Sequence, residues 1–243
     1  MRRLSRIYTP QVLTVGDTVE LEGQASHYLV CVLRLSVGDS VTLFNGNGED
    51  YSGGVREIQP QRVLVSLSGN TVPGTESALK ITLVQAISRR ERMDYTVQKA
   101  AELGVYAIQP LLSSRVEVKL DDKRQIKRLA HWRGVTIAAC EQSGRAVVPH
   151  ILQPISLGDW LAGEGDAQRL VLDPDATCKL SACTIAGDSI SVLIGPEGGF
   201  SPDELDQVRQ KGITAVSLGP RVLRTESAGP AAIAVLQVLA GDF

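Results

Sequence analysis

Residues 189–200 read SISVLIGPEGGF, and this stretch decides how the second half of the chain is interpreted. Six mostly apolar, strand-like residues lead into a loop with three glycines and one glutamate. Similar strand-like segments occur at 80–87, 105–112, 168–173 and 213–218, and helix-like segments occur between several of them. Near-continuous apolar strands that alternate with helices are typical of a parallel sheet covered on both faces. The sequence therefore predicts an α/β domain.

The first 70 residues have a different pattern. Short β-prone segments are separated by turn sequences such as NGNG at 45–48, and one short helix is expected around 24–34. Residues 68–77, SGNTVPGTES, are typical of a linker. The pattern predicts a small β-barrel domain over residues 1–72 and the α/β domain over residues 73–243.

Composition excludes several classes of protein. Hydrophobic residues make up 43% of the chain and charged residues 21%, as in ordinary globular proteins. Neither a secretory signal nor a run of about 18 apolar residues is visible, so we expect a cytoplasmic protein without a membrane partner. The four cysteines and three histidines show no metal-ligand spacing, and we expect reduced thiols and no metal.

Charge is unevenly distributed although the net charge is only −2. Residues 80–145 contain thirteen Lys or Arg against seven Asp or Glu, whereas the rest of the chain to its end contains six against twelve. A basic middle segment can bind a polyanion on one face, or it can simply be a solvated helix surface. Charge alone leaves both interpretations open.

Three loops that follow apolar strands contain the polar residues and glycines that are candidates for ligand binding. They read DPDATC at 173–178, GPEGGFSPDE at 195–204 and GPRVLRTES at 219–227. In open α/β sheets, ligands bind at the carboxyl ends of the strands, so these loops are expected to form walls of one cleft. A structural turn remains the alternative for each loop taken alone.

The composition of the loop at 195–204 limits which types of ligand could bind there. Ser201, Pro202 and Glu204 predict a helix start with a capping box. The loop lacks the P-loop lysine and the G-x-G-x-x-G spacing, and its carboxylates would repel a triphosphate. A ligand that carries positive charge, such as a sulfonium compound, or one whose adenine ring binds backbone groups, fits better.

The last helix, about 226–240, is apolar on nearly all sides. Between Ala231 and Ala240 only Gln237 is polar. A surface helix normally shows a single apolar stripe, so this one needs cover on more than one side. A dimer interface and a fully internal helix both explain the pattern, and the sequence favours the dimer.

Four motifs in order, QKAAELGV, AACEQSGR…VP, VLIGPEGGFSPDE and LGPRVLRTESA, resemble the bacterial 16S ribosomal RNA uridine-N3 methyltransferases of the SPOUT class. The resemblance covers nearly the whole chain. It implies S-adenosyl-L-methionine as the cofactor, a PUA-like N-terminal barrel that binds RNA, and an α/β domain with a deep C-terminal trefoil knot. It also implies a homodimer, which agrees with the interpretation of the last helix as an interface.

The resemblance also implies which residues form the cofactor site. These are Leu172, Pro174, Ile194, Gly195, Gly198, Leu218, Leu223, Arg224 and Thr225. One position departs from the expected pattern: Asp173 precedes Pro174 where some relatives are expected to have a histidine. The catalytic candidates are Arg145, Glu197 and Arg224, because methyl transfer to N3 of uracil needs a proton acceptor and a cation for the developing negative charge. The sequence leaves open which of them is the base.

The expected partner is 16S ribosomal RNA or the small ribosomal subunit. The basic residues expected to contact RNA are Arg2, Arg3, Arg6, Arg34, Arg89, Arg90, Arg92, Lys99, Arg115 and Lys119. Aromatic residues make up only 4% of the chain, which favours a structured RNA with one base turned into the pocket over a long stacked single strand. Alternatives are an RNA-binding module without catalysis, methylation of another base, and an oxidoreductase, for which the dinucleotide fingerprint is missing.

Overall fold

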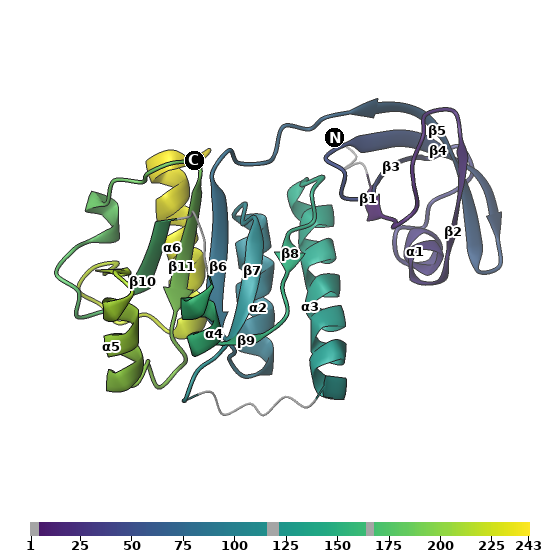
Figure 1. The fold of residues 1–243 in the computed structure, drawn as a ribbon. Coiled ribbons are helices and arrows are strands. Elements are labelled where there is room, and N and C mark those ends of the chain that lie inside the picture. The colour runs from purple at the N-terminus through teal and green to yellow at the C-terminus, as the bar shows by residue number, and fades with distance from the viewer. Residues whose placement is uncertain (1–4, 116–121, 164–167) are drawn as a thin grey trace. The chain divides into compact units, whose positions relative to one another are not determined.

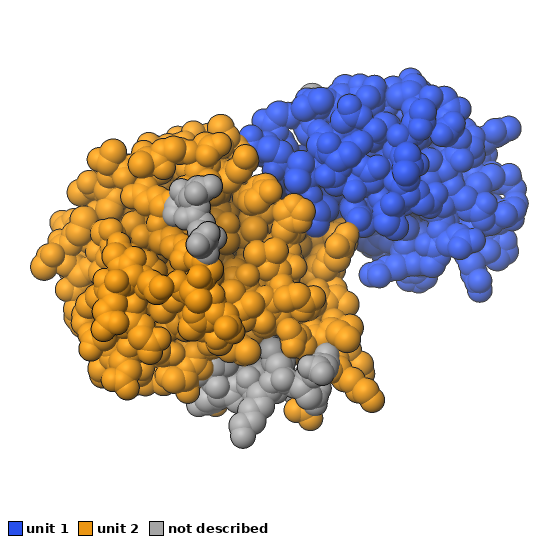
Figure 2. Space-filling view, viewed as in Figure 1, with its two compact units in different colours: residues 1–76, 140–148 blue, residues 77–139, 149–243 orange. Residues whose placement is uncertain are grey.

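A computed structural model describes residues 5–115, 122–163 and 168–243. The chain divides into two compact units, coloured separately in Figure 2. Unit 1 comprises Met1–Glu76 and Cys140–Val148, and unit 2 comprises Ser77–Ala139 and Pro149–Phe243. None of the helices in the described ranges is long and apolar enough to cross a membrane.

Unit 1 is built on a five-stranded sheet in the order β1-β3-β4-β5-β2. β1 and β3 are parallel, and the other neighbouring strands are antiparallel. The helix expected near residues 24–34 is present as α1 (Gly23–His27), followed directly by a π-helical turn (Tyr28–Val32). The strands are β1 (Ser5–Tyr8), β2 (Thr18–Glu22), β3 (Ser40–Phe44), β4 (Asp50–Gln59) and β5 (Arg62–Thr71).

The alternating apolar side chains of these strands form the core of unit 1. Val41 and Leu43 on β3 and Val63 and Val65 on β5 are almost completely buried in one cluster. The period of two residues places them on one face of the sheet. At about 25 cal/mol per Å² of apolar surface, burial of such side chains is the main stabilising term of this unit.

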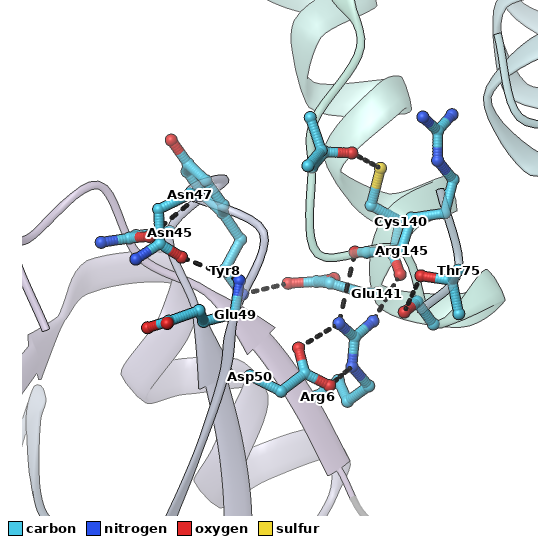
Figure 3. A network of polar contacts seen from close by, with 12 residues as sticks. Arg6, Tyr8, Asn45, Asn47, Glu49, Asp50, Thr75, Cys140, Glu141 and Arg145 are labelled. Carbon is cyan, nitrogen blue, oxygen red and sulfur yellow. Dashed lines mark hydrogen bonds and ion pairs between the residues drawn. The ribbon is translucent and has the colours of Figure 1, made fainter. Parts of the chain in front are cut away.

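A polar network within unit 1 binds the segment 140–148 to the sheet (Figure 3). The Arg6 guanidinium pairs with Asp50 and donates a hydrogen bond of 2.7 Å to the carbonyl of Cys140. The Tyr8 amide donates to the Glu141 carboxylate at 3.0 Å. Arg145 is buried and pairs with Glu76 through its Nη2 atom at 2.5 Å. The sequence gives no indication that residues 140–148, more than sixty residues after the expected linker at 68–77, belong to unit 1. Hydrogen bonds between segments so far apart leave no local pattern in the sequence.

Unit 2 contains a parallel sheet, as the apolar strands predict. Its main order is β12-β10-β11-β6-β7-β8, and β9 also pairs with β7. All pairings in this sheet are parallel. The strands are β6 (Lys80–Ala86), β7 (Ala107–Leu112), β8 (His150–Ile151), β9 (Ile155–Ser156), β10 (Gln168–Leu172), β11 (Ser189–Ile194) and β12 (Thr214–Val216).

Both faces of this sheet are covered, which explains why its central strands are apolar throughout. Leu83 and Val192 point into one cluster, whereas their neighbours Val84 and Leu193 point into another. The first cluster is completed by side chains from α2 (Arg90–Glu102), α3 (Asp122–Ser143) and α6 (Thr225–Ala240). The second is completed from α4 (Leu157–Ala162) and α5 (Pro202–Gln210), and Figure 1 shows these helices around the sheet.

Two helices of unit 2 begin in different ways. α5 begins with the predicted capping box, in which Ser201 accepts from the Glu204 amide and Glu204 accepts from the Ser201 amide. α6 begins without a side-chain cap, although Thr225 and Glu226 are candidates by type. The Thr225 hydroxyl instead hydrogen-bonds to Gln85 of β6 and to the carbonyl of Gly195, directly after β11.

α6 is buried along one stripe and partly exposed elsewhere. Ala228, Ala232, Ile233 and Leu236 are buried, in the i, i+4 and i+3 spacing of one helix face. Near the end of the helix, Val238 is 67% exposed. The apolar composition of the helix therefore exceeds what its own unit covers.

Candidate active site

A cavity of about 610 Å³ lies in unit 2 at the carboxyl ends of three neighbouring strands. Its walls come from the loops after β10, β11 and β12, together with Arg92 of α2. β10 pairs directly with β11 on one side and with β12 on the other, so the three loops leave the sheet at adjacent positions. The parallel topology thus brings together segments that lie up to about fifty residues apart in the sequence.

Close packing shapes the second loop. A Cβ atom on Gly195 would lie 3.2 Å from the ring of Phe200, which is itself buried. A larger residue at this position would displace the ring and the loop that follows β11. Glycine at 195 therefore allows the carbonyl of this residue to approach the start of α6.

A chain of buried hydrogen bonds fixes that approach. The Thr225 hydroxyl donates to the Gly195 carbonyl at 2.7 Å and accepts from Gln85 Nε2 at 2.9 Å. Gln85 and Thr225 are both buried, and a Cβ atom on Gly229 would lie only 3.0 Å from Gln85 Oε1. The loop after β11, the end of β6 and the first turn of α6 are therefore held together at the cavity wall.

The cavity carries mixed charge. Four carboxylates, from Asp173, Asp175, Glu197 and Glu226, and three guanidinium groups line it. Arg92 donates to Glu197 at 3.0 Å and lies 3.8 Å from Glu226. Oε2 of Glu226 is buried and has no hydrogen-bond partner among the described residues. A polar or positively charged group of a ligand could satisfy this acceptor.

Glu204 anchors the second loop beneath the cavity. In addition to its part in the capping box, its carboxylate accepts hydrogen bonds from the amide and hydroxyl of Ser114, at 2.7 and 2.9 Å. Burial by itself would raise the pKa of Glu204, but the hydrogen bonds from Ser201 and Ser114 outweigh burial and hold the pKa below its ordinary value. The loop after β7 is thereby tied to the start of α5.

The cavity brings together most of the residues expected at a cofactor site. Among the lining residues are Leu172, Pro174, Ile194, Gly195, Leu218, Leu223, Arg224 and Thr225. Gly198 is not one of them; its backbone carbonyl accepts a hydrogen bond from Arg115. Asp173, the position that departs from the expected pattern, also lines the cavity, and its carboxylate accepts from the Asp175 amide at 3.0 Å.

The three catalytic candidates have different surroundings. Glu197 and Arg224 line the cavity. Arg145 belongs to unit 1, where its guanidinium is buried against Glu76. The catalytic role of Arg145 stays a prediction, and these contacts give the side chain a structural part.

Several cations expected at an RNA surface are engaged within their own units. Arg6 is paired with Asp50, Arg92 with Glu197, and Lys99 with Glu102. Arg34 is exposed and has the uncommon φ of 53°. Arg2, Arg3 and Lys119, and the side chain of Arg90, lie outside the described part of the structure, while Arg89 precedes α2 and is exposed.

Sequence reasoning missed Gln85 and the place of Arg92 in the cavity. Gln85 had a visible signal, since it is a lone amide in the apolar stretch ITLV-Q-AI at 81–87. A buried polar residue in such a strand indicates a specific hydrogen-bond partner. Arg92 had no such signal, because its carboxylate partners lie more than a hundred residues further along the chain. No group of three His, Cys, Asp or Glu side chains arranged to hold a metal ion occurs within the described ranges.

Comparisons with known proteins indicate the family in which this cavity occurs. A family model described as an RNA methyltransferase domain matches residues 75–237, and one described as an RNA methyltransferase PUA domain matches residues 21–68. Ribosomal RNA small subunit methyltransferase E of Buchnera aphidicola from Schizaphis graminum is 33% identical over 243 residues, which cover 100% of this chain and 99% of the relative. The protein of the same description from Bacillus subtilis is 27% identical over 255 residues, with both chains fully covered.

Solved structures agree with the sequence comparisons. Ribosomal RNA small subunit methyltransferase E of Neisseria gonorrhoeae, solved with S-adenosyl methionine, has 39% identity and a TM-score of 0.93 and covers 99% of this chain and 100% of its own. A methyltransferase of Legionella pneumophila, solved with the same cofactor, has 37% identity, a TM-score of 0.95 and the same coverage. The chain therefore belongs to the RNA methyltransferase family that includes the ribosomal RNA small subunit methyltransferase E proteins.

Proposed function

We propose that this protein transfers a methyl group from S-adenosyl-L-methionine to N3 of one uridine in 16S ribosomal RNA, with the small ribosomal subunit as substrate. The observation that carries the proposal is the convergence of three strand-end loops on one cavity in a member of this methyltransferase family. Relatives similar over the whole chain were solved with this cofactor bound.

The residues of the cavity fit the cofactor. A volume of about 610 Å³ is within the range of small-molecule sites. Leu172, Ile194, Leu218 and Leu223 offer apolar surface for an adenine ring, and backbone groups of the glycine loop offer hydrogen bonds. The four carboxylates of Asp173, Asp175, Glu197 and Glu226 outnumber the three guanidinium groups of the cavity, and this balance favours a positively charged ligand. When bound, the cofactor supplies an electrophilic methyl group on its sulfonium sulfur.

The protein's own contribution is mainly positioning and charge. The buried contacts of Thr225 with Gly195 and Gln85 hold the loops at fixed separation, which keeps the reacting atoms in line. We assign Glu197 as the acceptor of the N3 proton and Arg224 as the cation that stabilises negative charge on the uracil oxygens. Arg92 orients Glu197 through their hydrogen bond.

Two finer features belong to the same proposal. The C-terminal chain forms a deep trefoil knot, in which the loops after β11 and β12 enclose the cofactor. Support comes from the path of α6, which follows the outer strand β12 and yet packs against β11, β6 and α2. The protein acts as a homodimer through α6, a proposal supported by the exposed apolar side chains of Val238 and Leu239 in the helix and of Phe243 just after it.

The function is tested by incubating unmodified small ribosomal subunits with the protein and radiolabelled S-adenosyl-L-methionine, then mapping the label by mass spectrometry. We expect a single 3-methyluridine in 16S RNA. Glu197→Gln should reduce the rate strongly, whereas Asp175→Asn, which changes another carboxylate of the cavity, should reduce it far less. Label on another base, or RNA binding without transfer, would contradict the proposal.

A further inference from the structure

The first half of α3 carries four cations at Lys123, Arg124, Lys127 and Arg128, called here the α3 basic face. The sequence has no Asp or Glu between residues 123 and 140. Asp122 begins the helix, but these four cations lie between it and the next carboxylate, Glu141, so positive charge dominates this segment. None of the four residues is among the cations that sequence reasoning assigned to RNA contact.

Helix geometry places these cations on one side of α3. With 3.6 residues per turn, positions 123 and 127 lie one above the other, as do 124 and 128, and the two rows adjoin. Lys123, Arg124 and Lys127 are exposed and Arg128 is half-buried. The helix packs on the protein through Leu129, which contacts the core cluster, and through Trp132 and Thr136, which are buried one and two turns beyond Arg128.

Three of the four cations of the α3 basic face differ in their pairing from Arg92 and Lys99 of α2. Lys123, Lys127 and Arg128 make no ion pair with a described residue, whereas Arg92 and Lys99 are bound to carboxylates. Cations in the first turns of a helix also oppose the helix dipole, which favours acidic side chains there. Helix stability therefore does not explain why four cations occupy this end.

We propose that the α3 basic face binds the phosphate backbone of ribosomal RNA. The inference rests on the proposed function and adds a contact surface to it. Arginine and lysine side chains on a helix can neutralise the phosphates of RNA. Residues 122–131 contain no Phe, Trp or Tyr, whereas the centre of a protein–protein interface is enriched in these side chains. In Figure 1, α3 lies at the β7–β8 end of unit 2, whereas the cavity lies at β10, β11 and β12. The face therefore contacts RNA remote from the target base.

The test uses protein that carries a fluorescent label and is saturated with S-adenosylhomocysteine. Its binding to small ribosomal subunits and to protein-free 16S RNA is measured over a range of salt concentrations. The neutralised variant is K123Q/R124Q/K127Q/R128Q. A charge-preserving variant, K123R/R124K/K127R/R128K, and a variant with two cations removed elsewhere on the surface, R209Q/K211Q, are the controls. Thermal unfolding and S-adenosylhomocysteine affinity are measured for each variant, and both should stay close to the wild type because none of the changed side chains is fully buried or lines the cavity.

The neutralised variant should bind both RNA substrates about 10- to 100-fold more weakly at low salt. The slope of log affinity against log salt concentration should become less steep by about two to four, because each lost phosphate contact changes the slope by roughly 0.7 to 0.9. The controls should retain the wild-type slope. An unchanged slope in the neutralised variant, or an equal loss in R209Q/K211Q, would overturn the proposal. A defect seen with subunits but not with protein-free RNA would also overturn it, because the partner would then be an acidic protein. If the wild type itself fails to methylate subunits, the proposed function fails, whatever the slopes show.

Discussion

At the scale of single residues, Thr225 holds two walls of the cavity together. Its hydroxyl donates to the Gly195 carbonyl and accepts from the buried Gln85 amide. This makes Thr225 a positioning residue by its contacts, since its only hydroxyl proton is already used. The cofactor role that the sequence predicts for Thr225 would then act through the shape of the pocket.

Thr225→Val should weaken binding of S-adenosylhomocysteine about 10-fold. Valine keeps the volume but removes the hydrogen bond to the Gly195 carbonyl and one of the two acceptors of Gln85 Nε2, which keeps the Ala86 carbonyl, at a cost of about 1–3 kcal/mol. Isothermal titration calorimetry gives the affinity. Thr225→Ser keeps the hydroxyl and should bind within a few-fold of the wild type; equal loss in both variants would show that the hydroxyl is not what matters.

A substitution of Arg145 distinguishes a catalytic role of this residue from a role in stability. Its side chain is 5% exposed and pairs with Glu76, whose side chain is 32% exposed. Arg145→Ala should lower the free energy of unfolding by about 2 kcal/mol, as expected when a charged hydrogen-bonding partner is removed. Chemical denaturation measures this loss. If stability is unchanged while methyl transfer is abolished and cofactor binding is retained, Arg145 acts in catalysis as the sequence predicts.

At the scale of elements, the start of α5 links the helix to the loop after β7. Glu204 accepts hydrogen bonds from Ser201 and Ser114, and these hold its pKa below the ordinary value of 4.5 although burial opposes them. A carboxyl whose pKa is lowered on folding stabilises the protein above its unfolded-state pKa. That contribution is lost as the pH falls through the lower, folded-state pKa.

Glu204→Gln should therefore lower the free energy of unfolding by about 1–2 kcal/mol at pH 7. The difference from the wild type should shrink as the pH falls below about 4.5, where the wild-type carboxyl becomes protonated as well. Urea denaturation followed by circular dichroism at several pH values measures both quantities. A difference that stays constant down to pH 3 would contradict the role given to the carboxylate.

The sequence predicted the elements of unit 2 better than the contacts between them. The apolar runs at 80–87, 168–173 and 189–194 correspond to strands β6, β10 and β11, because burial on both faces leaves a continuous local pattern. The capping box at Ser201 was likewise visible in four residues. The Arg92–Glu197 pair and the contacts of Arg145 join distant segments, and no local pattern specifies which partner each side chain will meet.

At the scale of the whole molecule, the exposed apolar end of α6 bears on assembly. Val238, near the end of the helix, is 67% exposed, and Phe243, three residues after the helix ends, is 61% exposed. Sedimentation equilibrium should show a dimer at micromolar concentration for the wild type and a shift toward monomer for Val238→Glu, since a charge in an apolar interface is costly. Lys211→Glu, on the surface after α5, should remain dimeric. A monomeric wild type would contradict the proposed homodimer.

The central claim is that the cavity between the loops after β10, β11 and β12 holds the methyl donor. The most direct measurement is a crystal structure of the protein with S-adenosylhomocysteine. We expect density for the ligand between Gly195, Leu218 and Thr225, with its sulfur on the side of Glu197. Density at another place in the molecule, or an empty cavity at saturating ligand concentration, would contradict it.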